Sequence, residues 1–197
     1  MTLRLETLTP GPTLDRLLEA LAELRIEVFR DWPYLYDGSR DFEARYLARF
    51  ATAAGSVLVA AFDGEHLVGA CTGLPLADEH PELAEPFRAA DHDLRRLFYG
   101  AETVLRRPWR GRGLYRRFFE RREAHARTLG FGTLVFCGVA RPDHHPLRPS
   151  DAVPLDPVWT RYGYRRLEGM VAGFSWKDVD QGAETTKPMQ FWGKPLA

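Results

Sequence analysis

One stretch of the chain constrains its fold more than any other: two strand-like segments separated by a glycine-rich turn and a helix. Residues 97–105 are rich in aromatic and β-branched residues, which are typical of a strand. Residues 131–140 form a continuous apolar run, which is typical of a strand buried on both faces. Between these segments, bulky side chains recur at helical spacing, at Leu114, Phe118, His125 and Leu129. A strand, a helix and a strand in this order predict two parallel strands joined by a right-handed crossover.

The turn before the helix has the sequence Arg110-Gly111-Arg112-Gly113. Glycines let the backbone approach an anion closely, and the first N–H groups of the following helix point towards whatever fills the turn. The chain has 27 basic and 27 acidic residues, yet arginines crowd this segment, at positions 106, 107, 110, 112, 116, 117, 121 and 122. The turn is therefore predicted to bind phosphate. Four of these arginines are interpreted instead as the solvated face of the helix: Arg116, Arg117, Arg121 and Arg122.

The turn resembles the pyrophosphate loop of the GNAT superfamily of acyl-CoA-dependent N-acyltransferases. The family pattern is Arg or Gln, two residues, Gly, one residue, and then Gly or Ala. Arg110, Gly113 and Tyr115 occupy these positions, so Tyr115 departs from the pattern. A second segment, Trp159-Thr160-Arg161-Tyr162-Gly163-Tyr164, is similar to the family's late segment and follows in the right order. A P-loop would need Lys and then Ser or Thr after the glycines, and a dinucleotide fingerprint would need a small residue in place of Arg116, so neither motif is present.

The resemblance implies that residues 1–197 form a single GNAT-like domain of the α/β class. Its mixed sheet is expected to be mostly antiparallel, to be splayed at the parallel βαβ unit, and to carry helices on both faces. Hydrophobic spacing and turn signals predict further strands near 3–8, 56–62, 67–73, 169–176 and 189–192, and helices from residue 13 to before Pro33 and over 41–51, 81–90 and 156–162. The segment 187–194 is expected either to pair between the subunits of a homodimer or to close the sheet within one chain.

The resemblance also implies where acetyl-CoA binds. The pantetheine arm is expected to lie like an extra strand in the gap between strands 98–105 and 132–140. The residues implied to contact the arm through their backbone are Val104, Leu105 and Arg106, and those implied to surround the pyrophosphate are Arg110, Gly111, Arg112, Gly113, Leu114 and Tyr115. Arg107 or Arg116 could reach the 3′-phosphate, and a role as ordinary surface arginines is an equal alternative.

Acyl transfer to an amine needs a base to take the ammonium proton and donors for the thioester oxyanion. Glu102 is a carboxylate within an otherwise apolar strand and is the candidate base. Its alternatives are a place on the solvated face of the strand or a pair with a nearby arginine. By resemblance to the family's strand bulge, the oxyanion donor is expected to be a backbone N–H near Val104.

An acid for the leaving thiolate is optional, because a coenzyme A thiolate is a fairly good leaving group. Many family members have a Tyr acid where this chain has Trp159, which carries no titratable hydroxyl. Tyr162 lies three residues further on, nearly on the same helical face, and is the first substitute candidate. The second is the pair His144 and His145, for which a place in a surface loop is the alternative.

The loop 31–38 is unusually aromatic for a connection and carries two carboxylates. Aromatic rings and carboxylates would suit an amine with an apolar or planar body, so this loop is a candidate for acceptor recognition. Capping of the core by Trp32 and Tyr34 is an equal alternative.

These features predict a cytoplasmic N-acetyltransferase that moves an acetyl group directly from acetyl-CoA to a primary amine. The amine would belong to a small molecule or to a protein N-terminus or lysine. No metal, nucleic acid or membrane is expected as a partner, since the net charge is zero and uncharged runs such as 50–62 are too short to span a bilayer. Cys71 and Cys137 are expected to be buried free thiols. The alternatives are a non-catalytic module that binds or senses acyl-CoA and, less favoured, a nucleic-acid binder.

Overall fold

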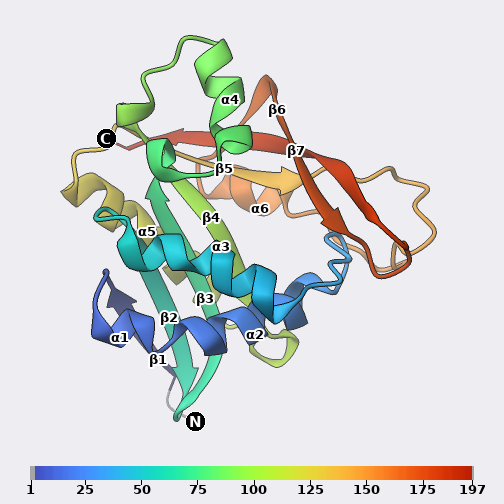
Figure 1. The fold of residues 1–197 in the computed structure, drawn as a ribbon, viewed down its shortest axis with the longest axis horizontal. Helices are drawn as coiled ribbons and strands as arrows, with labels where there is room; N and C mark the ends of the chain where they lie inside the picture. The colour runs from blue at the N-terminus through green and yellow to red at the C-terminus, as the bar shows by residue number, and fades with distance from the viewer. Residues whose placement is uncertain (1–2, 197) are drawn as a thin grey trace.

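The computed structural model describes residues 3–196, in which a seven-stranded sheet lies between helices (Figure 1). The strands are β1 (Leu3–Leu8), β2 (Val57–Asp63), β3 (His66–Pro75), β4 (Leu97–Leu105), β5 (Thr133–Val139), β6 (Arg165–Lys177) and β7 (Glu184–Pro195). The helices are α1 (Pro12–Asp15), α2 (Leu18–Phe29), α3 (Arg40–Thr52), α4 (Pro81–Ala89), α5 (Leu114–Thr128) and α6 (Asp156–Arg161), with short 3₁₀ turns η1 (Leu76–Asp78), η2 (Leu94–Arg96) and η3 (Arg107–Trp109).

The sheet has the order β1-β2-β3-β4-β5-β7-β6. Neighbouring strands pair antiparallel except β4 and β5, which pair in parallel and are connected by α5. The predicted βαβ unit and the mixed, mostly antiparallel sheet are therefore confirmed.

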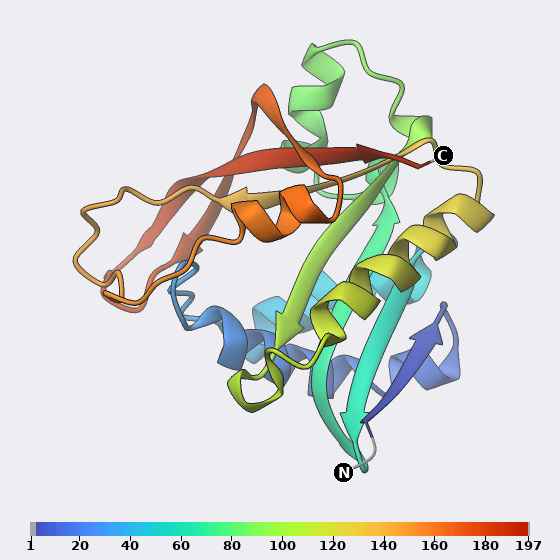
Figure 2. The same ribbon diagram turned by 180° about the vertical axis from the view of Figure 1, so that it is seen from behind.

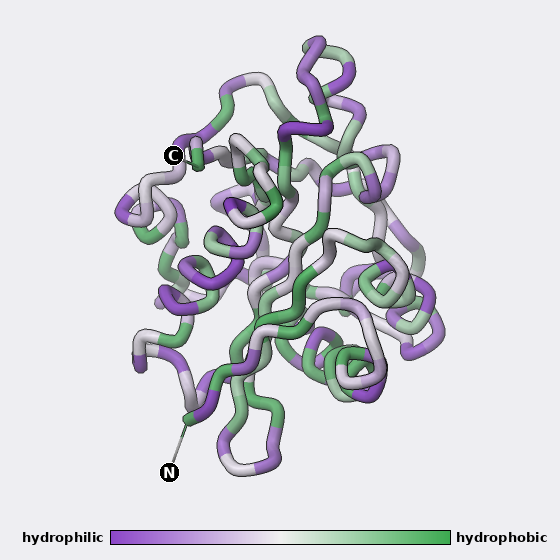
Figure 3. The backbone as a smooth tube through the Cα atoms, turned by 90° about the vertical axis from the view of Figure 1, so that its left-hand side faces the viewer, coloured by the Kyte–Doolittle hydropathy of each residue, from purple (hydrophilic) through white to green (hydrophobic). Residues whose placement is uncertain are grey.

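Helices cover both faces of the sheet, as predicted. We call the side covered by α2, α3 and α4 the α2 face; Leu24, Phe50 and Phe87 are among its buried side chains. We call the opposite side, where α5 and α6 lie, the α5 face; Leu114 and Phe118 are buried there (Figure 2). Each such side chain, when fully buried, contributes roughly 2 kcal/mol to folding. Figure 3 shows the apolar residues gathered along the strands, between helices of mixed polarity.

The sheet splays open between β4 and β5, as the resemblance implies. The two strands pair only where residues 97–99 lie beside residues 133–135, whereas β5 stays paired with β7 up to Val139. Figures 1 and 2 show the result: β1 to β4 form one arm and β5 to β7 form another, and the two arms diverge. The second half of β4 therefore has a free edge facing away from β3.

A β-bulge lies in the same part of β4. Cys71 pairs with Thr103, but Gly73 pairs with Gly100, so β4 has one more residue than β3 in this interval. A bulge interrupts the alternation of side chains between the two faces. The bulge therefore decides on which face of the sheet the side chains after Gly100 lie.

Two expectations about the elements need correction, and one pair of alternatives is decided. The helix predicted from residue 13 is divided into α1 and α2, and it begins at Pro12, whose fixed φ suits the first helical position. Strands β6 and β7 are longer than predicted because their outer residues are polar and lack a continuous apolar signal. Segment 187–194 lies in β7, which is hydrogen-bonded on both sides within one chain, so of its two alternatives closure of the sheet within one chain is confirmed.

Candidate active site

The free edge of β4 exposes alternate backbone groups. The N–H of Arg106 donates to the carbonyl of Val68 in β3, at 3.0 Å. Because groups alternate along an antiparallel ladder, Val104 also faces β3, while Thr103 and Leu105 direct their N–H and C=O groups towards the gap. Of the three residues expected to bond an extended ligand through the backbone, Leu105 is thus the one directed into the gap.

The turn before α5 is open, and its backbone adopts a left-handed conformation that suits glycine. Gly111 and Gly113 have φ values of 74° and 75°, in the left-handed region, and a Cβ on either would meet no atom within 4 Å. No side chain of the described chain caps α5, so its first N–H groups are available to an anion. The Arg110 guanidinium folds back and donates from Nε to the carbonyl of Leu105, at 3.0 Å, which joins the turn to the free edge of β4.

Some of the arginines near this turn are already neutralised. Arg106 pairs with Glu27 at 2.8 Å, Arg107 with Asp31 at 2.9 Å, and Arg116 with Glu120 at 2.7 Å. Within residues 3–196, five arginines of this segment form no ion pair with an acidic side chain: Arg110, Arg112, Arg117, Arg121 and Arg122. Partial burial and the charge of Arg107 lower the pKa of Arg110, as expected for a cation that lacks a counter-charge.

The prediction of a solvated helix face is wrong for Arg122. Arg116 and Arg117 are exposed and Arg121 is half-buried, but Arg122 is only 1% exposed. It follows Phe118 by four residues and precedes Ala126 by four, so it lies on the buried stripe of α5. Its side chain reaches the bulge of β4 from the α5 face.

Glu102 is buried on the α2 face and paired with an arginine, which is one of the alternatives for this residue. One oxygen of Glu102, Oε2, lies 2.5 Å from Nη1 of Arg25 in α2. Arg25 also donates from Nε to Glu43 of α3, at 2.5 Å. Both oxygens of Glu102 are buried and neither accepts a hydrogen bond from any group in the described part of the chain, and Oε1 also lies outside the ion pair.

Around Arg25, buried carboxyl groups outnumber the guanidinium groups that pair with them. Two guanidinium groups contact the ring of Tyr46, with Cζ of Arg25 at 4.2 Å and Cζ of Arg49 at 4.4 Å from its centroid. Arg49 forms an ion pair with Glu79, and burial nevertheless raises the pKa of Glu79. Three buried carboxyl groups, those of Glu43, Glu79 and Glu102, thus share two guanidinium groups. This arrangement favours a cationic group nearby.

A cavity of about 80 Å³ lies beside this cluster on the α2 face, where the sheet splays. Aromatic rings make up most of its lining, which consists of Arg25, Phe29, Tyr34, Tyr36, Phe42, Tyr46, Leu83, Tyr99, Ala101, Cys137, Phe174, Trp176 and Met189. The loop 31–38 contributes Tyr34 and Tyr36, whereas Trp32 packs against His145, with ring centroids 5.3 Å apart. Tyr34 is half-buried and packs against the core, as the capping alternative predicts for it, and the role of the loop in acceptor recognition stays a prediction.

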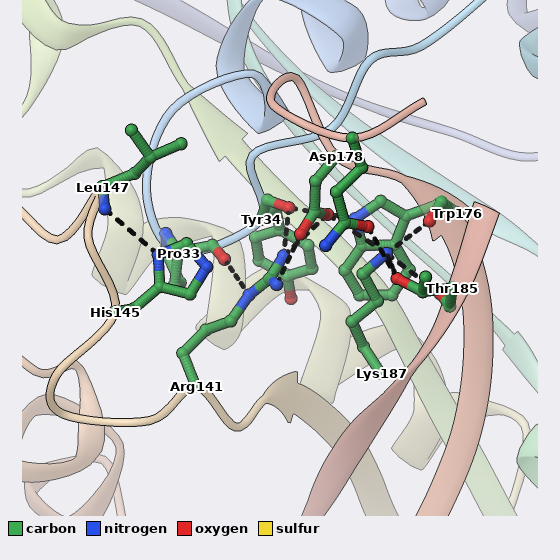
Figure 4. A network of polar contacts seen from close by, with 10 residues as sticks. Pro33, Tyr34, Arg141, His145, Leu147, Trp176, Asp178, Thr185 and Lys187 are labelled. Atoms are coloured by element: carbon green, nitrogen blue, oxygen red, sulfur yellow. Dashed lines mark hydrogen bonds and ion pairs between the residues drawn. The ribbon is translucent and has the colours of Figure 1, made fainter. Parts of the chain in front are cut away.

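An ionic network fixes the loop 31–38 to the hairpin of β6 and β7 (Figure 4). Arg141 makes two hydrogen bonds to Asp178, at 2.7 and 2.9 Å, and donates to the carbonyls of Pro33 and Tyr34. Lys187 of β7 lies 3.2 Å from the same carboxylate. The network holds Tyr34 against the hairpin of β6 and β7, and so sets one wall of the cavity.

Tyr162 lies on the α5 face, on the side of the sheet away from the Glu102 carboxylate. Its ring is 5.3 Å from Phe119 and 6.3 Å from Tyr115, between α5 and α6. The indole of Trp159 donates to the hydroxyl of Tyr115 at 2.9 Å, so the two departures from the family pattern are in contact. Burial raises the pKa of Tyr115 to about 12, which keeps this phenol protonated at neutral pH. His144 and His145 lie in the loop after β5.

Sequence reasoning did not identify Arg25 or the hydroxyl of Tyr115. The signal for Arg25 was its place on an apolar helix stripe, four residues after Leu21 and next to Leu24. For Tyr115 the sequence carries no signal, because its contact with Trp159 joins residues 44 positions apart.

No protein-family model matches the sequence, and no curated protein matches it either. Solved structures do match. A GNAT-family acetyltransferase of Staphylococcus aureus Mu50 superposes with a TM-score of 0.58 at 8% identity, covering 98% of this chain and 100% of that one. An acetyltransferase of Thermus thermophilus has a TM-score of 0.58 at 17% identity, with 100% and 98% covered. The chain has the GNAT fold.

The same GNAT fold is found in the PaiA N-acetyltransferase of Thermoplasma acidophilum in complex with coenzyme A. That structure has a TM-score of 0.56 and 10% identity, with 99% of each chain covered. At these identities the likeness establishes the fold alone.

Between residues 3 and 196, no helix has the length and apolar character needed to cross a bilayer. In the same range, His, Cys, Asp and Glu side chains form no group of three or more suited to a metal ion.

Proposed function

We propose that the protein is an acyltransferase that moves an acetyl group from acetyl-CoA directly to a primary amine. The observation that carries the proposal is the free edge of β4 joined to the open, basic turn at the start of α5. Such an edge suits an extended amide chain, and such a turn suits a pyrophosphate. The coenzyme A complex of the PaiA protein, which has the same fold, supports the choice of ligand.

The residues present fit acetyl-CoA on this edge. Leu105 would bond the pantetheine through its backbone, with Val104 and Arg106 beside it. Residues 110–115 would hold the pyrophosphate, chiefly through backbone N–H groups of the turn and of α5. The positive charge of Arg110 and Arg112, which acidic side chains leave uncompensated, would complement the phosphates.

The aromatic cavity is the proposed acceptor site. An ammonium group can lie against aromatic rings, and the excess of buried carboxyl groups around Arg25 favours its charge. We propose an amine with an apolar or planar body, carried by a small molecule or by a protein N-terminus or lysine side chain.

In the proposed reaction, Glu102 takes a proton from the acceptor nitrogen, directly or through water, at its free oxygen Oε1. The nitrogen lone pair forms a C–N bond to the thioester carbon, and the C–S bond breaks with its electron pair on sulfur. A phenol between α5 and α6, Tyr162 or Tyr115, donates the proton that the thiolate takes up, and the second proton that the nitrogen loses on forming the amide restores this phenol through water. Acetyl-CoA supplies the activated acyl group.

Calorimetry with acetyl-CoA, coenzyme A, ATP and a duplex oligonucleotide tests the binding part of the proposal. We expect acetyl-CoA and coenzyme A to bind. Arg112→Glu should weaken their binding about tenfold or more, which corresponds to about 1.4 kcal/mol. Arg95→Glu changes the charge equally at the other end of β4 and is the control. Binding of the oligonucleotide alone would overturn the proposal.

Release of thiol from acetyl-CoA across a panel of amines tests the chemistry. We expect Glu102→Gln to lower turnover about 100-fold while the affinity for acetyl-CoA changes less than about threefold. Glu43→Gln is the matched control, because Glu43 is also buried and paired with Arg25 but does not lie on β4. Equal losses in the two variants would remove Glu102 from the role of base.

A second candidate function is a non-catalytic module that binds or senses acyl-CoA. The ion pair of Glu102 with Arg25 favours it, since the carboxylate of the proposed base is engaged in a buried contact within the protein. Binding of acetyl-CoA without thiol release for any amine of the panel would support this candidate.

A further inference from the structure

Arg122 is a buried cation without a carboxylate partner. It is 1% exposed, and no acidic side chain in the described part of the chain lies within ion-pair distance of it. Its Nε donates no hydrogen bond within the same range. Burial of an unpaired charge is costly, so a position of this kind calls for an explanation.

All the polar contacts of Arg122 are made with the bulge between β3 and β4. Its Nη1 donates to the carbonyl of Thr72 at 3.2 Å, to the carbonyl of Glu102 at 3.1 Å, and to the hydroxyl of Thr103 at 3.2 Å. The guanidinium therefore meets three neutral acceptors and no anion.

The sheet leaves room for this guanidinium at two glycines. A Cβ on Gly100 would lie 2.7 Å from Cζ of Arg122, and one on Gly73 would lie 3.1 Å from its Cδ. Phe119 supports the guanidinium from the helix side, with Cζ 4.8 Å from the ring centroid. Packing against the sheet and against Phe119 thus fixes the position of the Arg122 side chain.

The peptide group that accepts from Arg122 also carries a free donor. The carbonyl of Glu102 and the N–H of Thr103 belong to one peptide unit. The carbonyl points to Arg122, while the register of β4 directs the N–H into the gap between β4 and β5. A cation bound to the oxygen of an amide draws electron density towards that oxygen, and the N–H at the other end becomes a stronger donor.

We propose that Arg122 is a positioning residue that strengthens the N–H of Thr103 as the donor to the thioester carbonyl oxygen. The inference rests on the proposed function. During attack by the amine, the carbonyl π electrons move to oxygen, and the Thr103 N–H stabilises the charge that develops there. Arg122 gives up no proton; it stays a cation behind the donor.

The same strand residue is then held from both faces of the sheet. Arg25 holds the side chain of Glu102 from the α2 face, and Arg122 holds its carbonyl from the α5 face. The proposed base and the proposed oxyanion donor are therefore fixed relative to each other across a single peptide unit.

Infrared spectroscopy of bound acetyl-CoA labelled with ¹³C at the thioester carbonyl tests the inference without a known acceptor. Arg122→Met keeps much of the side-chain volume and removes the charge. We expect the carbonyl stretch to shift to higher wavenumber in this variant, while the dissociation constant for acetyl-CoA changes less than about threefold. Arg117→Met removes an exposed arginine from the same helix and should leave the stretch unchanged.

Each outcome of this experiment is decisive. An unchanged stretch in folded Arg122→Met with acetyl-CoA bound overturns the inference and leaves the proposed function standing. If the wild-type protein fails to bind acetyl-CoA, both are overturned. If Arg122→Met does not fold, Arg122→Lys is measured in its place. Lysine keeps the positive charge but has fewer hydrogen-bond donors, so we expect an intermediate shift of the carbonyl stretch. No shift overturns the inference. With an acceptor in hand, kcat should fall about tenfold in Arg122→Met at an unchanged KM for acetyl-CoA.

Discussion

Arg25 brings a positive charge into the α2 face and shares it between two carboxylates. Its side chain is 8% exposed, and those of Glu43 and Glu102 are 0% and 1% exposed. Such a triad gains little over apolar packing while it is complete, but loss of the central cation leaves two buried anions with no partner. The geometry of Glu102 therefore depends on a residue 77 positions away in the chain.

We predict that Arg25→Met lowers the free energy of unfolding by about 3–5 kcal/mol at neutral pH, because Glu43 and Glu102 would stay buried without a counter-charge. Urea denaturation measures this. The control is Arg30→Met at the end of the same helix, where Arg30 is 60% exposed and pairs with Asp37; this variant should lose less than about 1 kcal/mol. Similar losses in the two variants would mean that the triad is not buried as a unit.

Two parts of the helix α5 have different roles. Its N-terminus is left uncapped and open, whereas its middle carries Arg122 into the sheet. The bounds of α5 follow from the sequence, since glycines precede it and apolar residues recur along it. The burial of Arg122 does not follow from its residue type: position 122 lies on the stripe of Phe118 and Ala126, but arginines of amphipathic helices usually lie on the solvated face.

At this scale we predict that Gly113→Ala costs about 1 kcal/mol of stability and weakens binding of coenzyme A, because alanine is strained at a φ of 75°. Thermal or urea unfolding and calorimetry measure the two effects. Gly182→Ala is the control, since Gly182 lies outside the left-handed region and has open space around it. Its stability should stay the same or rise by less than about 1 kcal/mol. If the two variants lose the same stability, backbone strain at the turn is not the cause.

The two arms of the sheet are drawn from different parts of the chain. The order of elements and the βαβ unit could be predicted from periodicity and glycines, and the splay followed from resemblance. The cavity could not be predicted, because it combines Arg25, Tyr46, Tyr99 and Trp176 from elements whose relative placement no local pattern encodes. The bulge near Glu102 follows from the resemblance alone, because it depends on pairing between strands, which hydrophobic alternation leaves open.

Across the molecule, the network around Asp178 ties the loop 31–38, which follows α2, to the arm of β5 to β7. Backbone bonds join Asp37 to Lys177 and Val179 to Leu35, and Arg141 and Asp178 lie beside them with side chains 7% and 0% exposed. Burial alone would raise the pKa of Asp178, but the hydrogen bonds from Arg141 and Lys187 outweigh it and lower the pKa. A lowered pKa means that the folded state holds the proton less tightly than the unfolded chain does.

The stability that Asp178 provides should therefore be complete above the ordinary aspartate pKa of about 3.9 and be lost as the pH falls through the lowered folded value. We predict that Asp178→Asn costs about 3 kcal/mol at about pH 7, because Arg141 and Lys187 lose their buried partner. The difference from the wild type should shrink below about pH 3.9. Urea unfolding as a function of pH measures it. Asp143→Asn, which removes a 98% exposed partner of Arg148, should cost less than about 1 kcal/mol throughout. A pH-independent difference for Asp178→Asn would show that its carboxylate charge does not hold the loop 31–38 to the arm of β5 to β7.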